Sequence, residues 1–264
     1  MLSKLAIGTV QFGQNYGISN KNGRPSETNV RRILNLASTS GITVLDTAPA
    51  YGQAELIIGR ILSSPNDFQI ITKTCALSGL SHKQSPSAAI LQTFEQSLSR
   101  MNIHKTYGLI VQLPDDLLGK QGDEVWKTLE GIKLNGSSGL IGVSCYKVDE
   151  ALEIIDRYPI DLIQLPFNIL DQELLSSGLL KKLIKRGIKV HTRSTFLQGL
   201  LLMDLKNLPK NFTRARPPLK KFQKMAKLFE LSRLELALRY TASVQGIDNI
   251  VIGVTKVEEL ENII

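Results

Sequence analysis

Short runs of Val, Ile and Leu recur along the chain, and amphipathic stretches separate them. Apolar runs of this length predict buried strands, whereas apolar residues spaced by three and four positions predict helices. The predicted strands are 5–8, 43–46, 69–73, 107–112, 140–144, 162–165, 189–193 and 249–252. The predicted helices are 29–37, 54–62, 87–101, 123–134, 148–158, 173–185, 219–231 and 234–241. Ser26, Ser85 and Gly41 stand at the ends of these helices, where capping residues are expected.

Strand and helix alternate through the 264 residues. This alternation is typical of parallel sheets whose strands are joined by crossover helices. Eight such units in a chain of this length favour a single-domain (β/α)8 TIM barrel over residues 1–264, rather than a doubly wound sheet. The first strand is not followed by GxGxxG, because Gly8, Gly13 and Gly17 are spaced differently, and the sequence has no GxxxxGK[ST] loop.

Composition excludes several classes of protein. With 42% apolar and 21% charged residues, the chain has the composition of an ordinary globular domain. No apolar run approaches the ~18 residues that a membrane helix needs, and residues 1–10 lack a hydrophobic signal core, so we expect a cytoplasmic protein with no membrane partner. Cys75, Cys145 and the three histidines lack metal-ligand spacing, which predicts no metal site.

The formal charge of +8 is concentrated in one segment. Residues 206–227 hold eight basic residues and no acidic one, and the other lysines and arginines match the 24 acidic residues in number. A nucleic-acid-binding surface normally spreads its basic residues over a face and mixes aromatic residues among them, so no nucleic-acid partner is expected. The expectation is that Lys206, Lys210, Arg214 or Arg216 faces an anionic cofactor or substrate, and that the lysines of 220–227 form a solvated helix face.

Polar residues stand at or near the carboxyl ends of six predicted strands. They are Asp46, Lys73, Gln112, Ser144, Gln164 and Arg193. A buried polar group costs free energy unless it finds a partner. Because the carboxyl ends of barrel strands meet at one face, and active sites lie there, the six residues predict one polar site.

Asp46, Tyr51 and Lys73 form the most informative pattern in the chain. Asp46 ends one strand, Tyr51 follows five residues later on the next loop, and Lys73 ends the following strand. A phenol with a pKa of ~10 is a poor proton donor or acceptor near neutrality unless a cation stabilises its phenolate. Lys73 supplies that cation, and Asp46 would hold the ammonium in place. The three residues therefore make chemical sense as a tuned acid and base.

This pattern resembles the aldo-keto reductase family, whose members pair an Asp-x4-Tyr motif with a lysine at the next strand end. The resemblance continues in order through segments 5–13, 141–146, 164–168, 194–201 and 251–256. It implies NAD(P)H-dependent reduction of an aldehyde or ketone, or the reverse oxidation, on a barrel without a Rossmann domain. The substrate class it implies is a small carbonyl compound, with sugars, sugar derivatives and anionic or sugar-linked compounds among the candidates.

The resemblance also assigns roles to residues. Tyr51 would be the general acid, Lys73 would lower its pKa, and Asp46 would position Lys73. The residues assigned to the cofactor are Ser144 and Gln164 for the carboxamide, Arg193 beside the ring, Ser194 next to it in the chain, and Thr255 and Lys256 for the 2′-phosphate of NADPH. A hydroxyl and an ammonium at a helix amino terminus suit a phosphate, so NADP(H) is preferred over NAD(H).

Three residues depart from the family pattern. Gln112 stands where the family usually has an active-site histidine, which places the chain in a bacterial branch with glutamine there. A glutamine amide can donate a hydrogen bond to a carbonyl oxygen but cannot become cationic. Cys145 replaces a common asparagine, and Arg193 replaces an aromatic residue that stacks on the nicotinamide.

Two other functions remain open from the sequence. The loss of the histidine at Gln112 is compatible with a non-catalytic NADPH-binding barrel that acts as a sensor or partner subunit. A lysine at a barrel strand end also permits a Schiff-base lyase that uses Lys73. The sequence makes no prediction about the oligomeric state.

Overall fold

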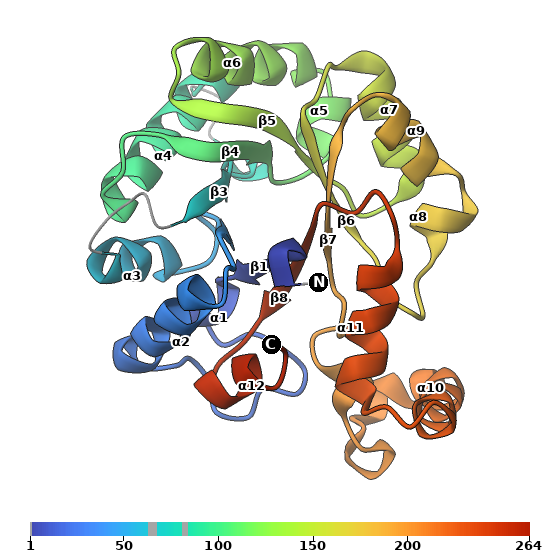
Figure 1. Ribbon diagram of the computed structural model, residues 1–264. Coiled ribbons are helices and arrows are strands. Elements are labelled where there is room, and N and C mark those ends of the chain that lie inside the picture. The colour runs from blue at the N-terminus through green and yellow to red at the C-terminus, as the bar shows by residue number, and fades with distance from the viewer. Residues whose placement is uncertain (1, 63–67, 81–83) are drawn as a thin grey trace.

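Eight parallel strands close into a barrel in chain order, with β1 beside β8 (Figure 1). The computed structural model describes residues 2–62, 68–80 and 84–264. The strands are β1 (Leu5–Gly8), β2 (Val44–Asp46), β3 (Gln69–Lys73), β4 (Thr106–Val111), β5 (Ser138–Ser144), β6 (Leu162–Pro166), β7 (Lys189–Arg193) and β8 (Asn249–Gly253). The predicted (β/α)8 barrel is confirmed.

Helices surround the strands (Figure 1). They are α1 (Val10–Gly13), α2 (Glu27–Thr39), α3 (Ala54–Ile61), α4 (Pro86–Met101), α5 (Asp115–Leu118), α6 (Gly122–Leu134), α7 (Val148–Arg157), α8 (Glu173–Ser176), α9 (Leu179–Lys185), α10 (Arg216–Leu228), α11 (Arg233–Ser243) and α12 (Val257–Glu261). Short 3-10 turns are η1 (Leu2–Lys4), η2 (Leu77–Gly79), η3 (Leu200–Leu202), η4 (Leu205–Asn207) and η5 (Lys210–Ala215). The predicted caps are present, because Ser26 Oγ accepts from Asn29 N at 3.3 Å and Ser85 Oγ accepts from Ala88 N at 3.2 Å.

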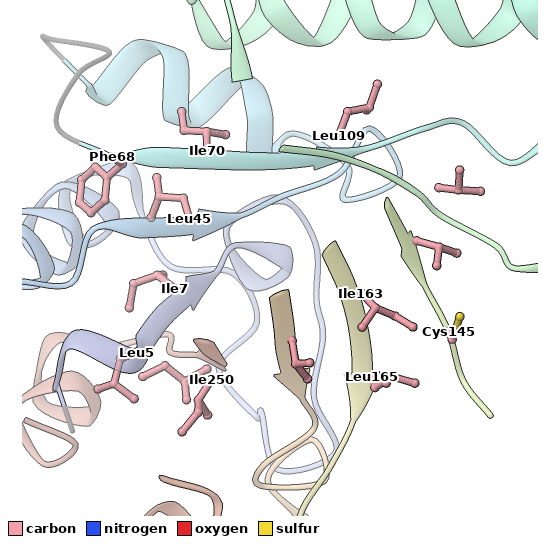
Figure 2. Packing of buried hydrophobic residues seen from close by; sticks show 14 of the residues in the cluster. Leu5, Ile7, Leu45, Phe68, Ile70, Leu109, Cys145, Ile163, Leu165 and Ile250 are labelled. Carbon is pink, nitrogen blue, oxygen red and sulfur yellow. The ribbon is translucent and has the colours of Figure 1, made fainter. Parts of the chain in front are cut away.

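The core has an outer and an inner layer. Residues such as Leu5, Ile7 and Leu45 belong to the large cluster between strands and helices (Figure 2). A smaller cluster fills the barrel interior with Ala6, Val44, Ile71, Ile110 and Leu162.

Successive side chains of a strand point to opposite faces, so a residue two positions after an interior one also points inward. Two residues on from Val44, Ile71, Ile110 and Leu162 come Asp46, Lys73, Gln112 and Gln164. Four of the six polar residues predicted at the strand ends therefore lie directly above the apolar filling of the barrel.

Three predicted boundaries are wrong in informative ways. The helix predicted for 173–185 is two helices, because Gly178 has a φ of +77° and a right-handed helix cannot pass through that conformation. The helix predicted from residue 219 begins at Arg216, since Pro217 and Pro218 fall in its first turn, where proline is tolerated. The fourth strand ends at Val111, so Gln112 follows the strand instead of ending it.

The segment between β7 and β8 builds a second apolar cluster around η3, α10 and α11. Leu201, Leu219, Phe222 and Ala237 are among its buried members. In Figure 1, α10 lies at the edge of the molecule beside α11. All eight basic residues of 206–227 are exposed, which confirms the solvated helix face predicted for the lysines of 220–227.

Among the described residues, no helix has the length and apolarity needed to cross a membrane.

Candidate active site

A buried ion pair joins the ends of β2 and β3. Lys73 Nζ lies 2.8 and 2.9 Å from the two carboxylate oxygens of Asp46 and donates to the Thr47 carbonyl at 3.0 Å. The Lys73 and Asp46 side chains are 1% and 4% exposed. A lysine ammonium has three donors, and three acceptors are present, so the buried charge is compensated. The sequence predicted this pairing from the strand ends alone.

Tyr51 lies above this pair on the loop between β2 and α3. Lys73 Nζ is 5.0 Å from the centroid of the Tyr51 ring. The loop is fixed by a close approach to Gly13, where an added Cβ would collide with the Tyr51 carbonyl oxygen. The Gly13 carbonyl also accepts from Arg24 Nη1 at 3.1 Å, which holds the same junction. The Asp46, Tyr51 and Lys73 side chains are thus brought together as expected.

The pKa of Tyr51 is shifted in the direction opposite to the one expected. Burial is the largest effect and raises it above its ordinary value of 10.0, whereas Lys73 lowers it and Asp46 raises it. For Lys73, burial is the largest single effect and lowers the pKa, but Asp46 and Tyr51 together raise it above 10.5. At neutral pH the site therefore holds a protonated phenol beside an ammonium ion.

Gln164 on β6 supports Asp46 by a hydrogen bond, and His191 on β7 lies near enough for the charge of Asp46 to affect its pKa. Gln164 Nε2 donates to Asp46 Oδ2 at 2.7 Å, so one of its two N–H groups faces the carboxylate. His191 is 1% exposed, and its Nδ1 has no hydrogen-bond partner among the described residues. Burial is the main cause that lowers the pKa of His191 to about 4, which keeps this imidazole neutral at physiological pH. The predicted carboxamide role of Gln164 remains a prediction.

A cavity of about 310 Å³ opens beside this cluster. Its walls come from the carboxyl ends of the strands and from the loops that follow β1, β7 and β8. Of the predicted site residues, Asp46, Tyr51, Gln164, Arg193, Ser194 and Thr255 line it. Lys73, Gln112, Ser144 and Lys256 are not part of the wall.

Gln112 and Ser144 are close to the site without lining the cavity. Gln112 follows β4, its backbone N–H donates to Thr74 Oγ1 at 3.2 Å, and its Oε1 is buried without a partner in the described chain. Ser144 is 2% exposed at the end of β5. Both keep their assigned roles as predictions.

Arg193 has a well-defined position on the cavity wall. Its Nη2 donates to the Cys145 carbonyl at 3.1 Å, and its guanidinium lies 4.4 Å from the centroid of the Tyr146 ring. Arg193 forms no ion pair with any carboxylate of the described residues. Its charge is therefore free to meet an anion.

Cys145 is buried, and burial is the main cause that raises the pKa of its thiol to about 12. The thiol is protonated at neutral pH and is not an activated nucleophile.

Several cavity residues were missed by the sequence analysis, Gln11, Tyr16, Thr195 and Glu259 among them. Gln11 on α1 packs against Gly253, and its Oε1 is buried without a partner in the described chain. Tyr16 lies on the loop after α1 and is 38% exposed. Nothing in the sequence pattern of that loop indicates a site, because its residues form neither a periodic element nor a motif.

The residues after β8 are arranged differently from the phosphate site that was predicted. Glu259 Oε2 accepts from the Thr255 backbone N–H at 2.6 Å and from the Lys256 backbone N–H at 3.2 Å. Thr255 Oγ1 is also 3.2 Å from this carboxylate oxygen. The Thr255 hydroxyl and the backbone N–H groups of Thr255 and Lys256 are thus already bound to a side chain of the same chain, whereas the Lys256 side chain is exposed.

The basic segment does not face the site. Lys206, Lys210, Arg214 and Arg216 are absent from the cavity wall, contrary to the expectation that one of them faces an anionic cofactor or substrate. α10 packs instead in the second apolar cluster, beside α11 at the edge of the molecule (Figure 1).

No group of three or more His, Cys, Asp or Glu residues in the described ranges is placed to hold a metal ion. His82 lies outside those ranges.

Comparison with known proteins agrees with this architecture. The chain is 26% identical over 284 residues to the aldo-keto reductase YhdN of Bacillus subtilis, covering 98% of this chain and 83% of that protein. It is 25% identical to the L-galactose dehydrogenase of Arabidopsis thaliana, covering 97% and 83% of the two chains. The solved glycerol dehydrogenase of Gluconobacter oxydans has the same fold, with a TM-score of 0.78 at 24% identity over 98% of this chain and 85% of its own.

The sequence model of the Aldo/keto reductase family matches residues 4–264, which is nearly the whole chain. The resemblance first carried by Asp46, Tyr51 and Lys73 thus extends to the entire barrel. This protein belongs to the aldo/keto reductase family.

Proposed function

We propose that this protein is an NAD(P)H-dependent oxidoreductase that reduces an aldehyde or ketone to an alcohol, with Tyr51 as the general acid. Family membership supports an oxidoreductase that acts on carbonyl compounds and uses a nicotinamide cofactor. The observation that carries the proposal is the buried Asp46–Lys73 pair placed beneath Tyr51 at the cavity wall. A cytoplasmic location stays a prediction of the sequence.

The cavity fits a nicotinamide cofactor in its polar chemistry. Gln11 Oε1 and Thr195 Oγ1 are buried polar atoms without partners in the described chain, and both residues line the cavity. Such atoms are costly unless a ligand or water completes them. Gln11, Gln164 and Ser194 would hold the nicotinamide end, which supplies the hydride when bound.

The remaining chemistry belongs to the chain's own residues. Tyr51 donates its hydroxyl proton to the carbonyl oxygen as the carbonyl carbon becomes reduced. The Lys73 ammonium stabilises the phenolate that remains, and Asp46 keeps Lys73 charged and in place. Gln164 in turn holds Asp46 through its 2.7 Å hydrogen bond. In alcohol oxidation the same phenolate takes the proton back.

One experiment tests this proposal against its alternatives. NADH and NADPH are titrated by fluorescence, and loss of reduced-cofactor absorbance is then followed with a panel of aldehydes and keto-sugars. Binding followed by turnover supports the reductase. Binding without turnover on the whole panel would favour a sensor or partner subunit, which the glutamine at position 112 permits. Borohydride trapping of a carbonyl compound on Lys73 would favour a lyase.

Gln112 is expected to act as a neutral hydrogen-bond donor to the carbonyl oxygen. The Gln112→Ala variant should lower kcat by about 10²-fold to 10³-fold, because loss of one such donor typically costs this much. The wild-type rate of reduction should show no limb near the ordinary histidine pKa of ~6.5, since His191 is buried and neutral. Reduction should decline only as the Tyr51 phenol, whose pKa is raised above 10.0, deprotonates on the alkaline side.

The Gln112→His variant is the matched control for this pH profile. It introduces a titrating imidazole at the same position, so an acid-side limb should appear in the variant alone. A wild-type limb near pH ~6.5 that survives in Gln112→Ala would contradict the assignment.

Arg193 is expected to select carbonyl substrates that carry a negative charge. Its guanidinium lines the cavity and meets no carboxylate among the described residues. The Arg193→Gln variant should lower kcat/KM for glyceraldehyde 3-phosphate by about tenfold or more, because a charge-assisted hydrogen bond is lost. For uncharged glyceraldehyde the change should stay within about threefold. Equal losses on both substrates would instead assign Arg193 to the cofactor.

A further inference from the structure

At the end of the cavity that follows β8, a carboxylate occupies the residues to which the family resemblance assigns the 2′-phosphate of NADPH. Glu259 Oε2 binds the backbone N–H groups of Thr255 and Lys256 at 2.6 and 3.2 Å. Its carboxylate also lies within hydrogen-bond distance of Thr255 Oγ1, at 3.2 and 3.4 Å from the two oxygens. A phosphate could use these donors only after the carboxylate had left them.

The charged residues of the cavity wall also disfavour a phosphate at this end. Thr255 and Glu259 both line the cavity, whereas the Lys256 side chain does not. Within the described chain, Arg193 is the one basic residue of the wall, and it is held on the β5 side by the Cys145 carbonyl. The eight basic residues of 206–227 contribute nothing to the wall. No cation of the wall therefore offsets Glu259 at this end.

We infer that Glu259 disfavours the 2′-phosphate and that this protein binds NAD(H) in preference to NADP(H). The inference rests on the proposed function, because it needs a dinucleotide in this cavity. Like charges placed side by side repel, and the displaced Glu259 carboxylate would lie beside a phosphate. A ribose 2′-hydroxyl has the opposite effect, since it can donate to a carboxylate, and an acidic residue is its usual partner in dinucleotide sites. The sequence-based preference for NADP(H) is thereby reversed.

Titration of NADH and NADPH by fluorescence tests this inference without any substrate. The wild type should bind NADH about tenfold more tightly than NADPH, which is the discrimination expected of one uncompensated charge near the surface. Glu259→Gln keeps the side chain's size and an acceptor oxygen but removes the charge. In that variant the affinity for NADPH should rise about tenfold, and the affinity for NADH should change by less than about threefold.

Glu258→Gln is the matched control, because Glu258 is exposed on the same helix and does not line the cavity. It should leave both affinities unchanged. Salt provides a second measurement on the unmodified protein, since screening should narrow the wild-type difference between NADH and NADPH.

Tighter binding of NADPH than NADH by the wild type, unchanged in Glu259→Gln, would overturn the inference and leave the reductase proposal standing. Failure of both cofactors to bind would overturn the two together. If Glu259→Gln does not fold, the wild-type ratio and its salt dependence still decide the question.

Discussion

Replacing Tyr51 with phenylalanine should lower kcat for carbonyl reduction by about 10³-fold while the affinity for the reduced cofactor stays within about twofold. A positioned general acid contributes roughly 10² to 10⁴ to the rate, and Phe removes the only group at this position that can deliver a proton. The ring itself remains, so its packing beside Lys73, whose Nζ lies 5.0 Å from the centroid, is kept. Steady-state kinetics and fluorescence titration of the same preparations measure the two quantities.

Tyr16→Phe provides a matched comparison for this loss. Tyr16 lines the same cavity, and burial raises its pKa above the ordinary value, yet it lies on the loop after α1, and the groups whose charge affects its pKa are Arg193 and Tyr146. Removal of its hydroxyl should change kcat by less than about tenfold. A Tyr51→Phe enzyme with nearly full activity would assign the proton transfer to another residue or to water. The same result would contradict the role given to Lys73, which is to stabilise the Tyr51 phenolate.

The barrel could be predicted from the sequence because its strands are buried on both faces. Such strands appear as continuous runs of Val, Ile and Leu, and the helices between them show an apolar stripe. The features that were missed are short or depend on one backbone angle. α1 and α5 are four residues each, which is about one turn and too short for a periodic pattern. The break between α8 and α9 depends on the φ of +77° at Gly178, which the surrounding apolar spacing hides.

In the site, too, the residues set by local sequence could be predicted, whereas contacts between distant segments could not. Asp46, Tyr51 and Lys73 could be found because a motif and two neighbouring strand ends place them. The bond from Gln164 to Asp46 spans 118 residues and depends on how β6 faces β2 across the barrel. The sequence pointed to Thr255 and Lys256 as phosphate donors, but it did not reveal Glu259, whose carboxylate accepts from both of their backbone N–H groups. The usual serine or threonine cap is absent here, because Lys256 stands at the cap position ahead of Glu259.

The basic segment shows where charge patterning stops being informative. Its location after β7 was correct, and the exposure of its lysines follows from the spacing of Leu219, Phe222 and Ala226 on the buried face of α10. The orientation of the basic segment relative to the cavity depends on the second apolar cluster, whose members come from several separate elements. Net charge along the chain carries no information about that packing.

Breaking the Asp46–Lys73 pair from one side should destabilise the fold as well as abolish activity. Asp46→Asn leaves an ammonium ion with 1% side-chain exposure and no counter-charge, and Lys73→Met leaves a carboxylate with 4% exposure. Removing one partner of a buried pair typically costs about 3 to 5 kcal/mol. The double variant Asp46→Asn/Lys73→Met should be more stable than the sum of the single losses implies, because no uncompensated charge remains. Urea unfolding followed by circular dichroism gives the free energies of all four proteins.

An exposed ion pair of the same chain provides the comparison. Arg60 and Glu27 are 2.8 Å apart with side chains 52% and 49% exposed, so Glu27→Gln should cost less than about 1 kcal/mol. Additive losses for Asp46→Asn and Lys73→Met would mean that the two charges are solvated independently in the folded protein. The Asp46 carboxylate would then not hold a charged Lys73 beside Tyr51. The stability measurements alone would thus contradict the assignment of Tyr51 as an acid that is supported by the Lys73 ammonium.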